Sequence, residues 1–285
     1  MPRDPITIHT PIRVKDGEIR RVENHICAEI PFTIRVNGAP RVTLMRTPGL
    51  ERELAVGFCF ADELIRAIED IREMTLDADD VAPFIRGINL TIPAQAGNAA
   101  QQDASLKSSS GSLNRLEILE NALRHIAPIQ SQARFDLAII DSFQDKLEAG
   151  QTLRARCGAT HGAALFDGQG NLLFCAEDIG RHNGLDKLIG HILLRRIPTD
   201  DKLLMLSSRA SFEMVQKAVK IAIPVMASVS APTDLALRMA DELNCTYISF
   251  LKKGGFYIYT HPERFGLSQE KLSDALKASD SVVCP

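Results

Sequence analysis

A regular alternation of short apolar runs with helical patterns in the C-terminal half is the feature that most constrains how this chain can fold. Residues 202–207 contain the continuous apolar run LLML, which is typical of a strand buried on both faces of a sheet. Strands that alternate with helices require crossover connections, so we expect an α/β fold with a largely parallel central sheet covered by helices. The predicted strands are 162–166, 172–177, 202–207, 224–229, 246–251 and 256–259, and the predicted helices between them are 185–193, 212–219 and 235–243.

The N-terminal half has a different pattern. Residues 32–36 alternate apolar and polar side chains, Asn37-Gly38 is a hairpin turn signal, and residues 41–45 form the returning strand. Apolar residues at helical spacing then run from Leu50 to Ile65. We therefore expect a small α+β unit with an apolar face of its own.

The two halves are joined by a small, polar stretch from Pro93 to Ser112. Such a segment buries too little surface to offset its ordering entropy, so it is either a flexible linker or a mobile functional loop. Two helices are predicted after it, near 116–123 and 139–147. The expected organisation is an N-terminal α+β domain at 1–105, a mobile loop at 106–114 and a C-terminal domain at 115–285.

The charge balance narrows the choice of partners. Lys and Arg number 33 against 36 Asp and Glu, a net charge of −3, which excludes a strongly basic chain built to coat nucleic acid. No uncharged apolar run approaches the roughly 20 residues that a membrane-spanning helix needs. The N-terminus lacks the apolar core of a secretory signal. We expect a cytoplasmic protein with no nucleic-acid or membrane partner.

Six cysteines are spread along the chain without a CxxC pair or the Cys/His spacing of a zinc site, so we expect free thiols and no metal. Cys157 has an imidazole close by in sequence, that of His161. If the fold brings the two together, the imidazole could hold the sulfur as a reactive thiolate; otherwise both residues are structural. The cysteines are Cys27, Cys59, Cys157, Cys175, Cys245 and Cys284.

Polar and basic side chains follow four of the predicted strands, at the point where each strand ends. In open α/β sheets, ligands bind beyond the carboxyl ends of the strands, and helix N-termini there offer free N–H groups to an anion. Arginine, lysine and hydroxyl groups at this edge therefore predict a site for a ligand that carries phosphates. The candidate residues are Arg181, His182, Asn183, Ser207, Arg209, Thr233, Lys252, Lys253, Gly254 and Gly255.

Structural roles are open for the same residues. Ser211 and Thr233 could be helix N-caps, and Gly254-Gly255 could be only a turn. Arg181 and Arg209 could pair with Asp178 and Glu213, and His182 could be structural. Alternatively, His182 and Asp178 could serve an unrelated small-molecule enzyme as acid and base. Neither GxGxxG nor a Walker P-loop occurs, which disfavours an ordinary dinucleotide enzyme or nucleotide triphosphatase.

Several long motifs, in fixed order, closely resemble the FdhD/NarQ family, whose members are accessory sulfurtransferases for formate dehydrogenase. They are ATHGAALF (159–166), EDIGRHNGLDKLIG (177–190), SSRASFEMVQKA (207–218), SAPTDLALRMADEL (230–243) and FLKKGGFYIYT (250–260). The stretch from EIPFTIRVNGAP to FADELI (29–65) is similar to the first domain of that family. The resemblance implies a C-terminal α/β/α domain of cytidine-deaminase-like fold beside the smaller α+β domain. The H-x-E and P-C-x-x-C zinc signature of the deaminases is absent.

The resemblance also implies a role. Members of the FdhD/NarQ family take sulfur from a cysteine desulfurase and pass it to the molybdenum cofactor, bis-(molybdopterin guanine dinucleotide), before that cofactor enters the formate dehydrogenase apoprotein. This cofactor carries phosphates, in agreement with the basic sheet edge. A homodimer is expected on the same ground. The family segment that contacts the cofactor matches Phe250, Leu251, Lys252, Lys253, Gly254 and Gly255.

One segment departs from the family pattern. The mobile loop of the family resembles SSCGVCGK, and its cysteines carry the persulfide. In this chain Ser110 and Leu113 stand at the two cysteine positions. A serine hydroxyl cannot form a persulfide, which needs a polarizable sulfur.

Three explanations of this departure are open. Another cysteine carries the sulfur, or the chain is a non-catalytic chaperone that binds the cofactor, or it is a diverged paralogue. Cys157 is the first candidate for the substitute cysteine because of His161, and Cys175 is the second.

Overall fold

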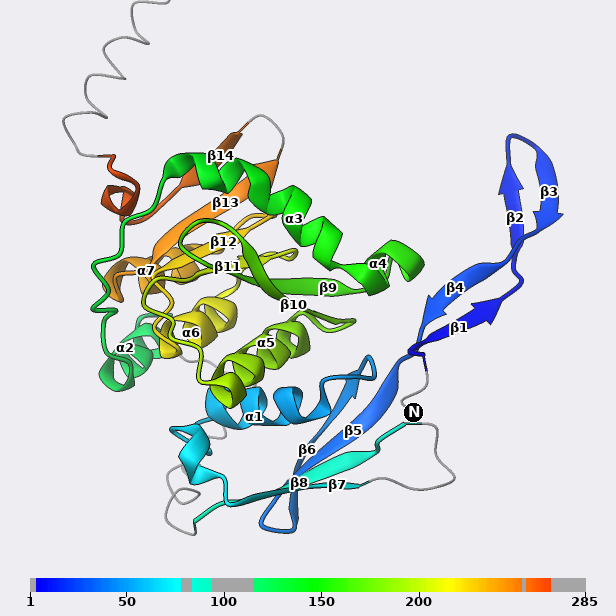
Figure 1. Cartoon of the computed structure of the whole chain (residues 1–285), viewed down its shortest axis with the longest axis horizontal. Helices are drawn as coiled ribbons and strands as arrows, with labels where there is room; N and C mark the ends of the chain where they lie inside the picture. The colour runs from blue at the N-terminus through cyan, green and yellow to red at the C-terminus, as the bar shows by residue number, and fades with distance from the viewer. Residues whose placement is uncertain (1–3, 78–83, 94–114, 253–254, 268–285) are drawn as a thin grey trace, which may run out of the picture.

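The computed structural model describes residues 4–77, 84–93, 115–252 and 255–267, and its centre is a mixed sheet in the C-terminal half (Figure 1). Within these residues the strand order of the sheet is β10-β9-β11-β12-β13-β14. The six predicted strands of this half are all confirmed. Their bounds are β9 His161–Phe166, β10 Leu172–Asp178, β11 Leu203–Leu206, β12 Val225–Ser228, β13 Thr246–Lys252 and β14 Gly255–Ile258.

The prediction of a largely parallel sheet is wrong in part. β11 and β12, and β12 and β13, pair in parallel, whereas β10–β9, β9–β11 and β13–β14 are antiparallel. Strands joined by a tight turn return beside their neighbour, and helical crossovers follow only β10, β11 and β12. Because β9 runs against both its neighbours, β10 points the same way as β11, β12 and β13. The carboxyl ends of these four strands therefore lie at one edge of the sheet.

Helices cover both faces of the sheet, as predicted. Apolar side chains of α2, α5, α6 and α7 pack on one face, and those of η3, α3 and η4 pack on the other. In the chain, the short helix α4 Thr152–Cys157 follows α3 and leads into β9. The bounds are α2 Arg115–His125, η3 Leu137–Ser142, α3 Phe143–Gly150, α5 Arg181–Arg195, α6 Phe212–Lys220, α7 Asp234–Glu242 and η4 Pro262–Phe265.

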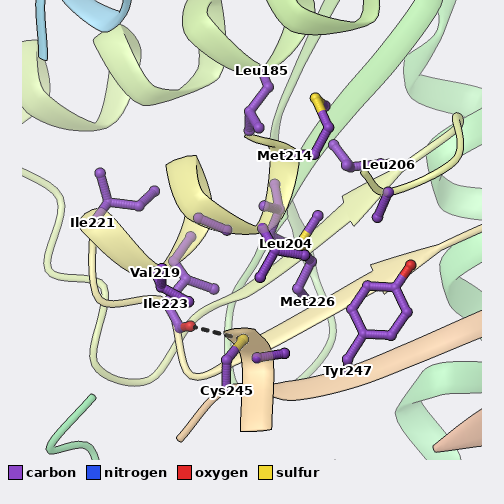
Figure 2. Close-up of a cluster of buried hydrophobic side chains, with 14 of the residues drawn as sticks. Leu185, Leu204, Leu206, Met214, Val219, Ile221, Ile223, Met226, Cys245 and Tyr247 are labelled. Atoms are coloured by element: carbon purple, nitrogen blue, oxygen red, sulfur yellow. Dashed lines mark hydrogen bonds between the residues drawn. The ribbon is translucent and has the colours of Figure 1, made fainter. Parts of the chain in front are cut away.

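Figure 2 shows the core on the α5–α6–α7 face, where aliphatic side chains of β11, β12 and α6 surround Cys245. The Cys245 thiol is fully buried and donates to the Ile223 carbonyl oxygen at 3.6 Å. Burial raises the pKa of this thiol to about 12. Cys245 is therefore a small apolar core residue, in the way that many buried cysteines are.

The N-terminal half folds as the predicted hairpin and helix, with two further strands. Its sheet has the order β6-β5-β8-β7, with β5 and β8 in parallel and the other pairs antiparallel. One face of this sheet packs against α1 around Phe32, Leu54 and Ile88, which are buried. The elements are β5 Ile30–Val36, β6 Ala39–Arg46, α1 Glu51–Ala61, η1 Ile68–Asp70, β7 Glu73–Asp77 and β8 Gly87–Thr91.

Before this sheet the chain forms an arm that projects from the body (Figure 1). The arm consists of two antiparallel strand pairs, β1 with β4 and β2 with β3. The sequence analysis did not predict these strands. Several of its apolar side chains are exposed, among them those of Val14 and Ile19. The bounds are β1 Ile6–His9, β2 Ile12–Lys15, β3 Glu18–Arg21 and β4 Asn24–Cys27.

The two sheets are joined through α1 and α5, which lie side by side between them (Figure 1). The helices approach so closely that a Cβ atom on Gly57 would lie 1.9 Å from the Asp186 carbonyl oxygen. A Cβ atom on Gly190 would lie 1.8 Å from the Glu53 carbonyl oxygen. No side chain larger than hydrogen fits at either position without moving a helix, so these two glycines set the distance between the halves.

The expected domain boundary at 105/106 and the loop at 106–114 lie outside the described residues and stay predictions. Among the described residues, no helix combines the length and apolarity needed to cross a membrane. Likewise, no three His, Cys, Asp or Glu side chains of this part gather in a way that could hold a metal ion.

The glycine contact between α1 and α5 predicts that alanine destabilises the protein at Gly190 but not at Gly184. We expect Gly190→Ala to lower the free energy of unfolding by about 1–3 kcal/mol, because the added methyl meets backbone atoms. Gly184→Ala in the same helix is the control: its Cβ would lie 3.6 Å from the nearest atom, and alanine gains up to about 1 kcal/mol of helix propensity. Urea unfolding of both variants measures this; equal effects would contradict the packing.

Candidate functional site

The predicted polar turns meet at one edge of the central sheet, and direct contacts link some of them. The start of β9 is bonded to the turn after β11, because the Gly162 N–H donates to the Ser207 hydroxyl at 2.8 Å. The turns after β11 and β12 are joined by a bridge between Ala210 and Pro232. The edge therefore carries the turns after β10, β11 and β12 next to one another, followed by the end of β13.

Two arginines at this edge are exposed. Arg181 begins α5, and Arg209 lies in the turn between β11 and α6. The alternative in which they pair with Asp178 and Glu213 is wrong: Asp178 pairs with Lys187 at 2.7 Å and Glu213 contacts His182 at 3.4 Å. Within the described residues, neither arginine forms an ion pair. Both guanidinium groups are thus free of these carboxylates and can meet an anion.

The two histidines of the edge are held mainly in the neutral form. Burial lowers the pKa of His182, with Lys217 adding to the effect and Glu213 opposing it. Burial also lowers the pKa of His161, and the charges of Arg154 and Arg181 lower it further. The buried Nδ1 atom of His161 has no hydrogen-bond partner in the part of the chain that the structure describes. A neutral imidazole beside two guanidinium groups is suited to hydrogen bonding rather than to carrying charge.

Three of the predicted binding residues have partners inside the protein. The Asn183 amide donates to the Met45 carbonyl at 2.9 Å and to Asp178 at 3.0 Å, so it connects the two halves of the chain. Ser207 accepts the bond from Gly162 described above. Thr233 is the N-cap of α7, which was the structural role predicted as an alternative to ligand binding. Its hydroxyl oxygen accepts a hydrogen bond from the Ala236 N–H at 3.4 Å.

Ser211, the other predicted cap, makes no capping hydrogen bond. Its Oγ atom is buried and has no hydrogen-bond partner among the described residues. Ser211 therefore occupies the N-cap position of α6, as predicted, but its side chain does not cap the helix.

The segment at the end of β13 is only partly described. Leu251 is buried and packs in the core beneath η3 and α3, so it supports the strand rather than facing a ligand. Phe250 has φ 56° and is partly exposed. The side chain of Lys252, and Lys253 and Gly254 entirely, lie outside the described residues; Gly255 begins β14 with φ 151°.

An aromatic cluster beside this segment was not predicted. The ring of Phe250 meets that of Tyr257 edge to face at 5.7 Å, and Tyr257 lies 6.2 Å from Tyr259. Tyr257 is 63% exposed, which is unusual for a ring of this size. Alternation along β14 could have indicated it, because Phe256 and Ile258 point into the core and leave Tyr257 on the other face.

Cys157 lies at the C-terminal end of α4. The start of this short helix is fixed by the buried Glu177 carboxylate, which accepts the N–H groups of Leu153 at 2.7 Å and Arg154 at 2.8 Å. The Cys157 thiol donates to the Leu153 carbonyl at 3.1 Å. Within the described residues it makes no hydrogen bond to His161, so the basis on which Cys157 was singled out is absent.

Cys157 nevertheless lines a cavity of about 360 Å³ at the sheet edge, next to the start of α5. A second thiol, Cys27 at the end of β4, lines the same cavity. Sequence analysis missed Cys27, although His25 lies two residues before it in the chain. The lining residues are Ile26, Cys27, Glu29, Met45, Cys157, Ala159, Ile179 and Gly180.

The other described thiols are poor candidates for chemistry. Cys59 is buried, and burial raises its pKa to about 12. Cys175, the second candidate from the sequence, packs against the core beneath α3, and burial together with Glu177 raises its pKa to about 12. Cys284, Ser110 and Leu113 lie outside the described residues.

A fully buried ion pair holds the edge in place. The Lys187 ammonium lies 2.7 Å from Asp178, and the two side chains are 1% and 0% exposed. Asp178 also accepts from the Thr47 N–H at 3.1 Å, and Lys187 donates to the Thr47 carbonyl at 2.9 Å. The pair therefore clamps the end of β6 onto the start of α5. Burial lowers the pKa of Lys187, and Asp178 opposes that shift.

We expect Lys187→Met to lower the free energy of unfolding by about 3–5 kcal/mol, because it leaves the Asp178 carboxylate buried without its counter-charge. The double variant Asp178→Asn/Lys187→Met removes both charges and should lose less than the single variant. The exposed pair of Arg196 and Glu69 supplies the control, and Glu69→Gln should leave the stability nearly unchanged because solvent screens this pair. Urea unfolding measures all three; a double variant less stable than Lys187→Met would contradict the argument.

The fold and this edge define a class of mixed α/β protein with a cavity that contains two thiols. Beside the cavity lie helix N-termini and two arginines, Arg181 and Arg209, that form no ion pair with the described residues. The model of the FdhD/NarQ family matches residues 27–266, and the chain belongs to that family. The resemblance of the sequence motifs is thereby confirmed.

Individual relatives agree with this assignment. The chain is 33% identical over 263 residues to the "Sulfur carrier protein FdhD" of Sulfolobus acidocaldarius, covering 90% of this chain and 96% of the relative. It is 36% identical over 252 residues to the protein of that name from Bacillus subtilis, covering 88% and 94%. A crystal structure of a candidate formate dehydrogenase accessory protein from Desulfotalea psychrophila has a TM-score of 0.73 at 24% identity and covers 92% of this chain and 99% of its own, a likeness of fold.

Proposed function

We propose that this chain is an accessory protein for formate dehydrogenase. In this role it carries sulfur from a cysteine desulfurase to the molybdenum cofactor, bis-(molybdopterin guanine dinucleotide), before the cofactor enters the apoprotein. Family membership and the names of the relatives support the general role. The observation that carries the proposal for this chain is a cavity lined by thiols at the same sheet edge as two unpaired arginines.

The sheet edge suits a ligand with phosphates and planar rings. Arg181 and Arg209 supply charge for phosphate oxygens, and the N-terminus of α5 supplies free N–H groups. The cluster of Phe250, Tyr257 and Tyr259 supplies ring faces on which a guanine or pterin can stack. Lys252, Lys253 and Gly254 belong to this proposal by family resemblance.

Cys157 is the residue to which we assign the sulfur. It is half-buried, lines the cavity and lies at the helix end nearest the sheet edge. In the loading step the Cys157 thiolate attacks the outer sulfur of a donor persulfide, forms Cys157–S–SH and releases the donor thiolate. This step does not involve His161, because the Cys157 thiol contacts the Leu153 carbonyl and, within the described residues, makes no hydrogen bond to His161.

The second candidate function is a chaperone that binds the cofactor without transferring sulfur. Ser110 and Leu113 at the family's cysteine positions favour it. We further propose a homodimer, a cytoplasmic location and a cytidine-deaminase-like C-terminal domain, each by resemblance to the family.

Sulfur loading separates the two functions. We expect the protein, sampled at short times after mixing with a cysteine desulfurase and cysteine, to gain transiently the mass of one sulfur, about 32 Da, on the peptide that contains Cys157. Cys157→Ser should abolish this adduct, whereas the matched control Cys175→Ser should keep it, because Cys175 lies in the core. Mass spectrometry of the intact chain and its peptides measures this. A protein that binds the cofactor and never gains sulfur would be the chaperone.

Ligand binding tests the sheet edge with GDP as the probe. We expect Arg181→Ala and Arg209→Ala each to raise the dissociation constant about 10- to 100-fold, since a charge-assisted phosphate contact contributes about 1.5–3 kcal/mol. Tyr257→Ala should weaken binding through the lost stacking contact. Arg195→Ala is the control, because Arg195 is exposed at the opposite end of α5. Calorimetric affinities insensitive to Arg181, Arg209 and salt would move the anion site elsewhere.

A further inference from the structure

The cavity at the sheet edge brings together two thiols from distant parts of the chain. Cys27 ends β4 of the projecting arm, and Cys157 ends α4 of the C-terminal half. Both are half-buried, both are free, and both line the same space. β4 and α4 are packed directly against each other. A pair of thiols facing one cavity can do chemistry that neither can do alone.

Both thiols are held in place by contacts across the two halves. The Cys27 sulfur lies 3.3 Å from the Thr47 hydroxyl, and Thr47 is the residue clamped by the buried Asp178–Lys187 pair. On the other side, Arg156 of α4 binds Asp4 at the base of the arm through two hydrogen bonds of 2.6 and 3.2 Å. Arg156 thus ties the helix with Cys157 to the arm, and Thr47 links the strand with Cys27 to Asp178 and Lys187 of the C-terminal half.

The surroundings give the two sulfurs different reactivity. Burial raises the pKa of Cys27, the Thr47 hydroxyl opposes this, and the nearby Cys157 and Asp178 raise it further. Cys157 ends a helix whose last turn carries the cations of Arg154 and Arg156. We therefore assign the first attack to Cys157 and the second to Cys27.

Sulfur delivery has an electron requirement that a second thiol meets. The outer sulfur of a persulfide is at oxidation level zero, whereas hydrosulfide is two electrons more reduced. When a second thiolate attacks the inner sulfur of a persulfide, the S–S bond to the outer sulfur breaks and hydrosulfide leaves with the bonding electron pair. The two cysteine sulfurs are left joined as a disulfide, so they have supplied the two electrons.

We infer that Cys27 and Cys157 form a dithiol sulfur-release site, in which Cys157 holds the persulfide and Cys27 displaces its outer sulfur as hydrosulfide into the cavity. The step is Cys157–S–SH + Cys27–S⁻ → Cys157–S–S–Cys27 + HS⁻, and the proton lost by Cys27 passes to solvent. A dithiol reductant then restores both thiols. This inference rests on the proposed loading of Cys157 and adds the residue that discharges it.

The cavity lies where the released sulfur is required. Its lining includes Ile179 and Gly180, and the next residue along the chain is the exposed Arg181 that begins α5. Hydrosulfide set free here emerges beside the cations and N–H groups that we assign to the cofactor phosphates. Release of the sulfur and binding of the phosphates would then take place at the same edge of the sheet.

The test uses glutathione persulfide as the sulfur donor and the reduced full-length chain. We expect the wild type to release hydrosulfide and to yield a disulfide-linked peptide pair containing Cys27 and Cys157. Cys27→Ser should retain the sulfur adduct on Cys157 and release hydrosulfide at least about tenfold more slowly. Cys175→Ser, with its thiol outside the cavity, should behave as the wild type. Mass spectrometry and a colorimetric sulfide assay supply the readouts.

A second measurement probes the geometry without any persulfide. Mild oxidation of the reduced wild type with diamide should form the Cys27–Cys157 disulfide before any other, whether or not the serine variants fold. Stable loading of Cys157 in the wild type, with no disulfide and no sulfide, would overturn the dithiol site and leave the proposed function intact. Absence of loading on Cys157 in both the wild type and Cys27→Ser, with the diamide disulfide present, would overturn the proposed function instead. Failure of the diamide disulfide would by itself refute the pairing.

Discussion

The buried ion pair of Asp178 and Lys187 is the interaction on which the rest of the structure depends. A charge at this depth is tolerated only when its partner and hydrogen bonds are complete, so the backbone around Thr47 must dock against the start of α5. Asp178 also accepts from the Gly180 N–H and the Asn183 amide, which fixes the first turn of the helix. The close glycine contact of α1 with α5 then sets the spacing of the two sheets. The polar groups fix the orientation of the two halves relative to each other, and the apolar packing stabilises the contact between them.

That orientation creates the candidate site. The cavity takes Cys27 and Met45 from the N-terminal half and Cys157 and Ile179 from the C-terminal half, so neither half contains it alone. The same clamp that orients the halves also places Thr47 against the Cys27 sulfur. Beside the cavity, the four strands that end at one edge bring Arg181 and Arg209 to the same rim. The proposed anion binding and the proposed storage of sulfur would therefore both depend on how the two halves dock.

Local patterns predicted the elements well and their contacts less well. Apolar periodicity located the strands and helices of the central sheet, because burial on a sheet or helix face leaves a repeat of two or near 3.6 in the chain. Apolar periodicity overestimated the parallel pairing, since β9 lies between β10 and β11 and is antiparallel to both. It did not find the arm at β1–β4, whose apolar residues face outward. The proposed pairing of Arg181 and Arg209 with Asp178 and Glu213 failed because Lys187 and His182 occupy those carboxylates.

By itself, the sequence determined the α/β class, the basic and hydroxyl-bearing turns and the family, because each is written in consecutive residues. It also places Ser110 and Leu113 at the positions where the resemblance to the family leads us to expect cysteines. Only the tertiary structure decided which thiols face a cavity, since Cys27 and Cys157 meet through the docking of a strand and a helix from opposite halves. Burial likewise decided the fate of Cys175 and Cys245, because the depth of a side chain depends on the whole fold and leaves no mark beside it in the chain.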